Sequence, residues 1–226
     1  MSSKKKALVL FSGGQDSTTC LFWALQNFDS VVAVNIYYGQ RHAVEVDAAK
    51  KIAELARVEL IEVQTDVFKS IGDSAMFHPE QDISQAHRSS GNLPASFVPG
   101  RNLLFLTIAA AIAYKHDITD IVTGVCQTDY SGYPDCRDHT IKALTVTLGL
   151  GMGHPFNIHT PLMFMTKAES IHFAWRIPGC FDSLGWSHTC YEGKVPPCGV
   201  CPSCLLRQKG FEEAGMPDPL VARTRS

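Results

Sequence analysis

The sequence predicts an α/β fold in which a Rossmann-like parallel sheet carries helices on both faces and a small metal-binding segment follows at the C-terminus. Three observations support this prediction. Apolar runs typical of buried strands alternate with helix-like segments through most of the 226 residues. A glycine-rich turn joins the first of these strands to the first helix. Four of the eight cysteines lie within residues 190–204.

The first half of the chain contains three predicted strands. The run ALVLF, residues 7–11, predicts a buried strand, and a helix is expected over about 17–27. A second strand begins at Val31, and a helix is expected over about 43–56 because apolar side chains recur there at helical spacing. The run VELIEV, residues 58–63, predicts the third strand.

The second half begins with a stretch from about 64 to 100 that is rich in Ser, Gly and Pro, and we expect a long loop of the lid or binding type there. The apolar run at 103–114 predicts a buried helix, and DIVTGV, residues 120–125, predicts the next strand. A loop is expected over 126–137, with a helix from about 138 onward. The runs FNIHTPL and TKAESIHFAW predict one more strand and helix.

Alternating strands and helices form parallel sheets, and the loops that follow such strands gather at one edge, where ligands bind. We therefore expect the glycine loop and the polar runs YYGQRH, GRN and TGVCQTDYSGYPD near one edge of the sheet. In YYGQRH, a ribose or base contact and a solvated helix start are equally favoured by the pattern.

The composition is that of an ordinary globular protein, with 45% hydrophobic residues, 19% charged residues and a net charge of −2. Because there is no basic excess, binding to nucleic acid is not expected, and small-molecule chemistry is favoured. The longest apolar run is too short to span a membrane. No targeting segment is recognised, so we expect a cytoplasmic protein without membrane contact.

The segment SGGQDS, residues 12–17, predicts an anion-binding loop. Gly13 and Gly14 allow close approach to the backbone, and the following helix directs its N–H groups and positive dipole end to the same point. Ser12, Ser17 and Thr18 would add hydroxyl donors. The alternative is an ordinary glycine turn in which Asp16 caps the helix. Phosphate binding is favoured because strand, motif and helix occur together.

This loop lacks the Gly-Lys-Ser/Thr element of a Walker loop and the third glycine of a dinucleotide-binding loop. It resembles the loop of the PP-loop, or N-type, ATP pyrophosphatases, which have an adenine nucleotide alpha hydrolase-like fold. The resemblance implies cleavage of ATP between its α and β phosphates, adenylation of a substrate, and Mg²⁺ bridging the phosphates. The ATP-binding residues are then expected to be Phe11, Ser12, Gly13, Gly14, Gln15, Asp16, Ser17, Thr18, Thr19, Cys20 and Leu21.

The cysteine-rich segment CYEGKVPPCGVCPSC predicts a metal site. Cys190, Cys198, Cys201 and Cys204 can close a tetrahedral shell around one structural Zn²⁺ per chain, and a helix starting near Cys204 would favour its thiolate. An iron–sulfur cluster and a redox C-x-x-C pair are the alternatives. The isolated cysteines are interpreted as small core residues, with Cys126 on the expected ligand edge: Cys20, Cys126, Cys136 and Cys180.

Further polar residues near the expected ligand edge have two interpretations each. Arg101 could bind phosphate or carboxylate through its fork of donors, or pair with a surface acid. Lys167 could offset charge on the phosphates, or be an exposed lysine at a helix start. The run TDYSGYPDC offers aromatic faces and carboxylates that suit a purine-like ring, although tyrosine-rich loops also serve packing: Asp129, Tyr130, Ser131, Tyr133 and Asp135.

Taken together, the motifs FSGGQDSTTCL, YYGQRH, GRN, TGVCQTDYSGYPDCR, TPLMFMTKAE and HTCYEG…CGVCPSCLLR resemble the 7-cyano-7-deazaguanine synthase family of the bacterial queuosine pathway. The resemblance covers about residues 7–210. One departure is His159 before TPL, where glutamate is expected in many relatives.

The resemblance implies a ligase that uses ATP, 7-carboxy-7-deazaguanine and free ammonia, and a homodimer. The expected catalytic residues are Asp16, Ser17, Arg101 and Lys167, and the expected substrate-binding residues are Tyr130, Tyr133 and Asp135. The expected division is a PP-loop ATP-binding domain over 1–185 and a zinc-binding segment over 186–226 packed on it. A PP-loop tRNA thiolase and a zinc-ribbon interaction module are the rival interpretations, and the acidic balance argues against the thiolase.

Overall fold

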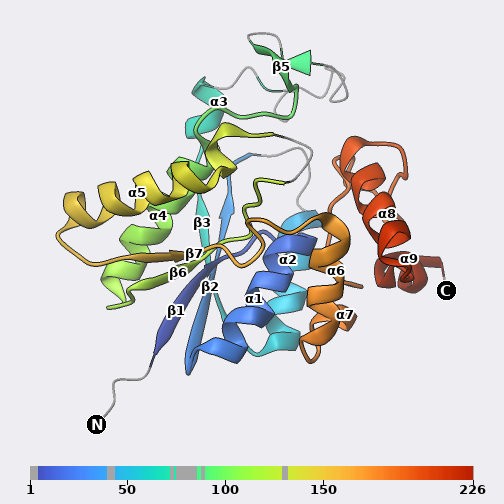
Figure 1. The fold of residues 1–226 in the computed structure, drawn as a ribbon, viewed down its shortest axis with the longest axis horizontal. Helices are drawn as coiled ribbons and strands as arrows, with labels where there is room; N and C mark the ends of the chain where they lie inside the picture. Colours follow the sequence, from blue (N-terminus) through green and yellow to red (C-terminus); the bar gives the residue numbers. More distant parts are fainter. Residues whose placement is uncertain are drawn as a thin grey trace.

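A computed structural model describes residues 5–39, 44–71, 74, 86–87, 90–128 and 132–225. Figure 1 shows a central sheet with α4 (Arg101–Lys115) and α5 (Asp138–Met152) on one face and with α1 (Gln15–Asn27), α2 (Val44–Ala56) and α6 (Lys167–Arg176) on the other. The predicted parallel α/β fold is confirmed.

The main sheet consists, among the described residues, of five parallel strands in the order β3-β2-β1-β6-β7. The chain moves outward from β1 in one direction to β3 and then returns to the other side of β1. The turn after β1 therefore lies at the switch point, where ligands bind in such sheets. The strands are β1 (Lys6–Leu10), β2 (Ser30–Tyr37), β3 (Glu59–Gln64), β6 (Asp120–Val122) and β7 (Asn157–His159).

The strand residues alternate between two cores, as the pleat requires. Ala7 and Val9 of β1 pack toward α1, α2 and α6, and Leu8 packs toward α4 and α5. Both faces are apolar because both are covered, which explains why the strand sequences read as continuous apolar runs.

The structure shifts several predicted boundaries. The predicted strand over 120–125 ends at Val122, because Thr123 already leaves the sheet after its N–H donates to His159 O at 3.0 Å. The long loop predicted over 64–100 contains α3 (Val67–Ile71) and a small antiparallel pair, β4 (Ala86–His87) with β5 (Ser90–Pro94). Elements this short carry too few residues to show periodicity in the sequence.

The C-terminal part contains α7 (Cys180–Ser183), α8 (Pro202–Ala214) and α9 (Pro219–Arg225), and α8 packs along α6. Arg207 of α8 is only 4% exposed. Its guanidinium binds Asp218 through two N–H donors at 2.6 and 2.8 Å, Ser187 Oγ at 2.8 Å and Leu184 O at 3.1 Å. One buried arginine therefore ties α8 to the segment after α7 and to the start of α9. The division at residue 185 stays a prediction.

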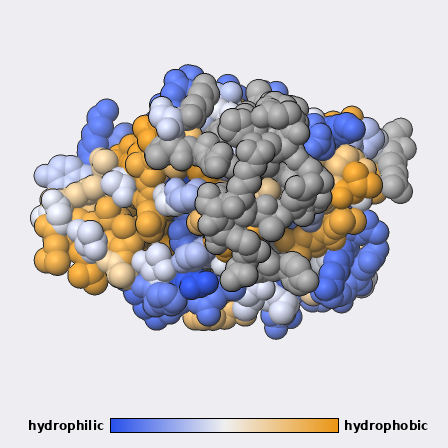
Figure 2. Space-filling view, turned by 90° about the horizontal axis from the view of Figure 1, so that it is seen from above, coloured by the Kyte–Doolittle hydropathy of each residue, from blue (hydrophilic) through white to orange (hydrophobic). Residues whose placement is uncertain are grey.

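An exposed apolar face lies on α5, where Val146 is 61% and Leu150 is 82% exposed. Figure 2 shows apolar side chains gathered at the end of the molecule that α5 occupies. Within the described ranges, none of the helices is both long and apolar enough to cross a membrane.

Candidate functional site

The glycine loop joins β1 to α1 and packs tightly against α2. Gly13 has a φ of +84°, and a Cβ there would lie 2.6 Å from the backbone nitrogen of Ala49 and 2.7 Å from the carbonyl oxygen of Glu45. Only glycine therefore lets the loop turn and lie against α2. Gly14 is the N-cap of α1 and has no side-chain cap, so the first N–H groups of the helix have no side-chain acceptor from the cap.

Two serine hydroxyls face each other across this loop. Ser12 Oγ and Ser17 Oγ lie 3.0 Å apart, Ser17 Oγ donates to Gly14 O at 3.1 Å, and the Gly14 N–H donates to Ser12 Oγ at 3.3 Å. These groups lie where an anion at the helix N-terminus would meet them, and a phosphate oxygen can replace the serine contacts as acceptor. The arrangement is able to bind an anion.

The remaining residues of the predicted ATP segment are buried. Thr18 and Thr19 donate their hydroxyls back to Gly14 O and Gln15 O, at 2.8 and 3.0 Å, so both hydroxyls are engaged inside the helix. The side chains of Phe11, Cys20 and Leu21 belong to the core. Contact of all these residues with ATP stays a prediction. Any contribution of the Phe11, Cys20 and Leu21 side chains acts through packing beneath the loop.

Lys167 and Asp16 form an ion pair beside the loop. Lys167 Nζ lies 2.8 Å and 3.1 Å from the two carboxylate oxygens of Asp16, with the lysine side chain 15% and the aspartate side chain 26% exposed. Lys167 is the first residue of α6, whose start is fixed by a capping box between Thr166 and Glu169. The sequence placed both residues among the catalytic candidates, and the structure brings them together.

A shallow depression opens at this ion pair. It is lined by residues of the first turns of α1 and α6 and of the segments that follow β6 and β7: Asp16, Cys126, Leu162, Met165, Thr166, Lys167 and Ser170. A charged pair at the rim of a depression next to a helix N-terminus is suited to bind the phosphates of a small molecule and the group that reacts with them.

Two glycines that the sequence analysis did not single out shape this site. A Cβ on Gly124, after β6, would lie 3.0 Å from the backbone nitrogen of Ser17, so this glycine lets β6 approach the start of α1. A Cβ on Gly210 of α8 would lie 2.5 Å from Cγ of Lys167. Gly124, in the run TGV after β6, could have been recognised from the sequence as a position of close backbone approach. Nothing near Gly210 in the sequence points to the site.

We predict that Gly210→Ala lowers kcat about tenfold, because the new methyl group displaces the stem of Lys167 and small misplacements of catalytic groups cost activity steeply. Alanine favours a helix by about 1 kcal/mol over glycine, which offsets part of the overpacking cost, so stability should change less than activity. Steady-state kinetics and urea unfolding measure the two effects.

Gly149→Ala is the matched control, because its new Cβ would meet only His154 O at 3.6 Å, an ordinary contact. Equal activity in both variants would show that the close approach of α8 does not position Lys167.

Arg101 lies in a second group of residues, at the first turn of α4. Its Nη1 donates to Tyr38 OH at 3.3 Å, and its guanidinium carbon lies 6.0 Å from the Tyr38 ring and 5.8 Å from the Tyr133 ring. Burial opposes the charge of Arg101, but the neighbouring hydroxyls of Tyr38, Tyr133 and Tyr191 outweigh it and raise its pKa. Arg101 is therefore a permanent cation held among aromatic rings.

Tyr133 and Asp135, predicted to bind substrate, are 8% and 5% exposed and already have partners. Tyr133 OH lies 2.7 Å from Ser96 Oγ, and Asp135 accepts the Asn102 N–H at 2.9 Å, which stabilises the start of α4. Substrate recognition by these two residues stays a prediction. The remaining candidates of the runs TDYSGYPDC and YYGQRH lie outside the described residues, namely Asp129, Tyr130, Ser131, Gln40, Arg41 and His42.

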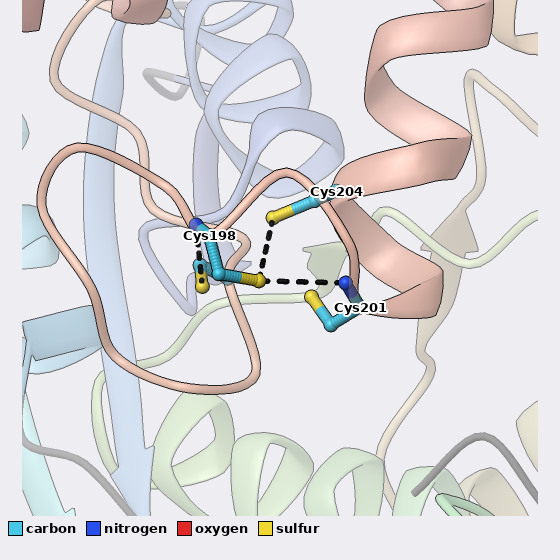
Figure 3. A group of neighbouring side chains, drawn as sticks. Cys198, Cys201 and Cys204 are labelled. Carbon is cyan, nitrogen blue, oxygen red and sulfur yellow. Dashed lines mark hydrogen bonds between the residues drawn. The ribbon is translucent and has the colours of Figure 1, made fainter.

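The four predicted metal ligands lie together, and Figure 3 labels three of them, Cys198, Cys201 and Cys204. The sulfur atoms of Cys190, Cys198, Cys201 and Cys204 are all within 4.8 Å of one another. The Cys201 N–H donates to Cys198 Sγ at 3.4 Å and the Cys198 N–H to Cys190 Sγ at 3.5 Å, contacts that stabilise thiolates. Sulfur atoms around a tetrahedral Zn²⁺ are about 3.8 Å apart, so this cluster is able to hold a metal ion.

The expectation that the helix starts near Cys204 is confirmed, because Cys204 lies in its first turn. Helix α8 begins at Pro202, and Cys201 is its N-cap residue. A hydrogen bond from the Cys204 thiol lowers the pKa of Cys201, and stabilisation of the Cys204 thiolate by the start of the helix stays a prediction.

The four isolated cysteines differ in their surroundings. Cys20 and Cys180 are buried, and burial raises the pKa of both, that of Cys180 to about 12, which confirms them as core residues. Cys136 and Cys126 are half-buried. Cys126 donates its thiol hydrogen to Met165 O at 3.3 Å at the edge of the depression.

His159 lies away from the loop. Its Nε2 lies 2.7 Å from the Asp120 carboxylate, and its ring packs against Trp23 of α1 and against Phe28, the C-cap residue of that helix. Partial burial opposes the charge of Asp120, but hydrogen bonds from His159 and Thr119 outweigh it and lower the pKa of Asp120. The stability that this carboxylate supplies is therefore present at neutral pH and lost as the pH falls below about 4.

We predict that His159→Glu destabilises the protein by about 1 kcal/mol at pH 7, because two partly exposed carboxylates would then face each other. The difference from wild type should shrink below pH 4, where protonation removes the repulsion. Urea unfolding at pH 7 and pH 3.5 measures this, with His159→Gln as the uncharged control. An equal loss in Glu and Gln variants would mean that charge is not the cause.

Comparison with known proteins supports one family. A family model described as queuosine biosynthesis protein QueC matches residues 6–215. Proteins named 7-cyano-7-deazaguanine synthase are 55% identical in Chromobacterium violaceum, over 100% of this chain and 97% of the relative. The identity is 52% in Laribacter hongkongensis, over 96% and 94%, and 46% in Bacillus subtilis, over 93% and 95%.

A likeness to a solved structure concerns the fold alone. The structure of a 4-thiouridine synthetase in complex with RNA and bound ATP is 18% identical and has a TM-score of 0.55. The match covers 96% of this chain and 52% of the synthetase chain. The α/β fold expected from the sequence is supported by this likeness.

Proposed function

The chain belongs to the family of the queuosine biosynthesis protein QueC, and we propose that it is an ATP-dependent ligase that converts 7-carboxy-7-deazaguanine and ammonia to 7-cyano-7-deazaguanine. The observation that carries this proposal is the 46–55% identity, over nearly the whole chain, to enzymes that bear the name of this product. The glycine loop beside the Asp16–Lys167 pair supports the use of ATP.

The proposed chemistry has two activations. A carboxylate is a poor electrophile, so its oxygen first attacks the α-phosphorus of ATP and releases pyrophosphate. Ammonia then attacks the acyl adenylate, AMP leaves, and the amide forms. The amide oxygen attacks a second ATP, and loss of AMP together with the N–H protons gives the nitrile. Each nitrile therefore requires two ATP and yields two AMP and two pyrophosphate.

The proposed roles of the loop residues follow from their positions. The backbone N–H groups of residues 12–17 hold the phosphates at the start of α1, and the Ser17 hydroxyl, now bonded to Ser12 and Gly14, turns to a phosphate oxygen. Lys167 faces the negative charge that develops on the phosphate. Asp16 orients Lys167 and is the proposed carboxylate for Mg²⁺, which would supply charge neutralisation between the phosphates.

Arg101, Tyr130, Tyr133 and Asp135 are the proposed residues for the deazapurine acid. Arg101 retains donors beyond the one that contacts Tyr38, and a guanidinium fork suits a carboxylate. Tyr133 packs against Phe97, with ring centres 5.4 Å apart, so its role is to hold the aromatic wall beside Arg101.

For the cysteine cluster we propose one structural Zn²⁺ per chain, held by all four thiolates with no open position. Zinc would supply a rigid cross-link between the loop at 190–201 and α8. Elemental analysis of the purified protein should give about one zinc per chain, and iron with acid-labile sulfide would contradict the assignment.

We also propose a homodimer and a cytoplasmic location. The exposed apolar face of α5 supports self-association, and eight cysteines without a disulfide suit a reducing compartment. Light scattering after size exclusion should give twice the mass of one chain.

The test of the function is incubation with ATP, Mg²⁺, the 7-carboxy base and ¹⁵N-ammonium. We expect a nitrile whose mass carries one ¹⁵N and two AMP for each nitrile, measured by mass spectrometry. Omission of ammonium should stop nitrile formation, and Ser17→Ala should weaken ATP turnover. Turnover of ATP that requires tRNA instead of the base, or no turnover at all, would contradict the proposal.

A further inference from the structure

A short segment, residues 187–191, contacts three groups of residues: the glycine loop, the aromatic residues around Arg101 and the cysteine cluster. We call it the bracing segment. It begins after α7, contains His188 and Tyr191, and includes the metal-ligand candidate Cys190. Its contacts connect the cysteine cluster with the glycine loop and with the tyrosines around Arg101.

The bracing segment holds the glycine loop through one backbone hydrogen bond. The His188 N–H donates to Gly13 O at 3.0 Å. In a planar trans peptide the C=O and the following N–H point in opposite directions. Fixing the Gly13 carbonyl toward His188 therefore directs the Gly14 N–H away from it, toward Ser12 Oγ at 3.3 Å. That N–H is one of the proposed phosphate donors.

The same segment is fixed to the cysteine cluster. His188 is buried, and its Nε2 donates to Cys190 O at 3.0 Å. This hydrogen bond connects the residue that contacts the glycine loop to the predicted metal ligand Cys190. The Cys190 sulfur in turn accepts the Cys198 N–H at 3.5 Å. A metal ion bound by the four sulfurs would immobilise Cys190 and with it the carbonyl that orients His188.

Tyr191 extends the connection to Arg101. Its ring packs both on the cysteine cluster and on the apolar group formed by Tyr38, Phe68, Ala95 and Val98. This apolar group borders Arg101, because Arg101 Nη1 donates to Tyr38 OH at 3.3 Å. The other end of the segment is held by Arg207, which donates to Ser187 Oγ at 2.8 Å.

We propose that metal binding at the cysteine cluster strengthens nucleoside triphosphate binding at the glycine loop, and that His188 and Tyr191 are the positioning residues that carry this coupling. The proposal rests on the proposed binding of ATP at that loop. Coupling between two sites is reciprocal, so ATP strengthens metal binding by the same factor. The cluster then has a function in the ligase beyond holding the C-terminal helices.

Hydrogen–deuterium exchange and calorimetry test the coupling. In the wild-type protein loaded with Zn²⁺, the amides of His188 and Thr18 should exchange slowly, because they donate to Gly13 O and Gly14 O, both at 3.0 Å. After chelation, or in Cys201→Ser, we expect at least tenfold faster exchange at these amides and at least tenfold weaker binding of ATP with Mg²⁺. Cys180→Ala, which removes a core cysteine outside the cluster, should behave as wild type.

His188→Ala separates the coupling from loss of the fold. This variant should retain one zinc per chain, yet show severalfold faster exchange at the amides of position 188 and Thr18 and severalfold weaker ATP binding. His154→Ala is the matched control, because His154 Nε2 also lies near a backbone oxygen, that of Ile118 at 3.3 Å, far from the cluster in the fold. It should leave both measurements unchanged.

Unchanged exchange at the amides of position 188 and Thr18 in both the metal-free protein and His188→Ala would overturn the coupling. If the loaded wild type does not bind ATP, the proposed function fails, and the exchange measured without nucleotide still decides whether the metal holds the loop. Faster exchange in α4 and α5 of His188→Ala would also overturn it, because the effect would then be general unfolding.

Discussion

Replacing Lys167 with methionine is expected to lower kcat by about 100- to 1,000-fold, the usual effect of removing one charged donor from a developing negative charge. Lys167 Nζ lies 2.8 Å from Asp16 at the start of α1, so the variant also removes the cation that pairs with this carboxylate beside the proposed phosphate site. Methionine keeps the length and packing of the lysine stem against α8. AMP release under saturating substrates measures kcat.

Lys209→Met is the control for charge removal, because Lys209 is an exposed lysine of α8 whose pair with Glu213 is 3.6 Å long. It should keep wild-type kinetics. If Lys167→Met raises KM for ATP and leaves kcat intact, Lys167 binds the ground state only, and its assignment as a catalytic residue is wrong.

Replacing Arg207 with methionine is expected to lower the free energy of unfolding by about 3–5 kcal/mol, the range found when one partner of a buried ion pair is removed. Asp218 is 11% exposed and would be left without its cation. The contacts with Ser187 Oγ and Leu184 O would also be lost. Urea denaturation at pH 7 measures the change.

Two variants make this result interpretable. Adding Asp218→Asn to Arg207→Met should restore part of the stability, since it removes the unpaired charge. Lys142→Met breaks an exposed pair with Asp138 on α5 and should cost less than about 1 kcal/mol. A loss in Arg207→Met as small as in Lys142→Met would show that the arginine is not the anchor of α8.

The sequence was sufficient where a feature depends on residues that are neighbours in the chain. Alternating apolar runs predicted the order of strands and helices, and the Ser-Gly-Gly motif predicted the turn between β1 and α1. The spacing of the four cysteines predicted a cluster that the structure brings within 4.8 Å. Local chemistry of this kind is visible before the fold is known.

The sequence was insufficient where the feature depends on packing between distant segments. The partner of Asp16 is 151 positions away, and nothing in the pattern of either segment identifies Lys167 as that partner. The same holds for His188, which contacts Gly13, and for Arg207, whose helix position looks like an ordinary surface arginine. The sequence also could not predict that Asp135 accepts the Asn102 N–H, because this hydrogen bond requires the start of α4 to pack beside Asp135.

Gly13, Gly124 and Gly210 come from three separate parts of the chain, and at each of them a neighbouring segment occupies the space that a methyl group would need. The site around Asp16 and Lys167 is thus bordered at these three positions by main chain and by the stem of Lys167. A change of side-chain rotamer therefore makes little room there. Attempts to broaden substrate choice by mutagenesis should therefore leave these three positions alone and vary Tyr38 and Tyr133, whose rings face Arg101 at the proposed site of the deazapurine acid.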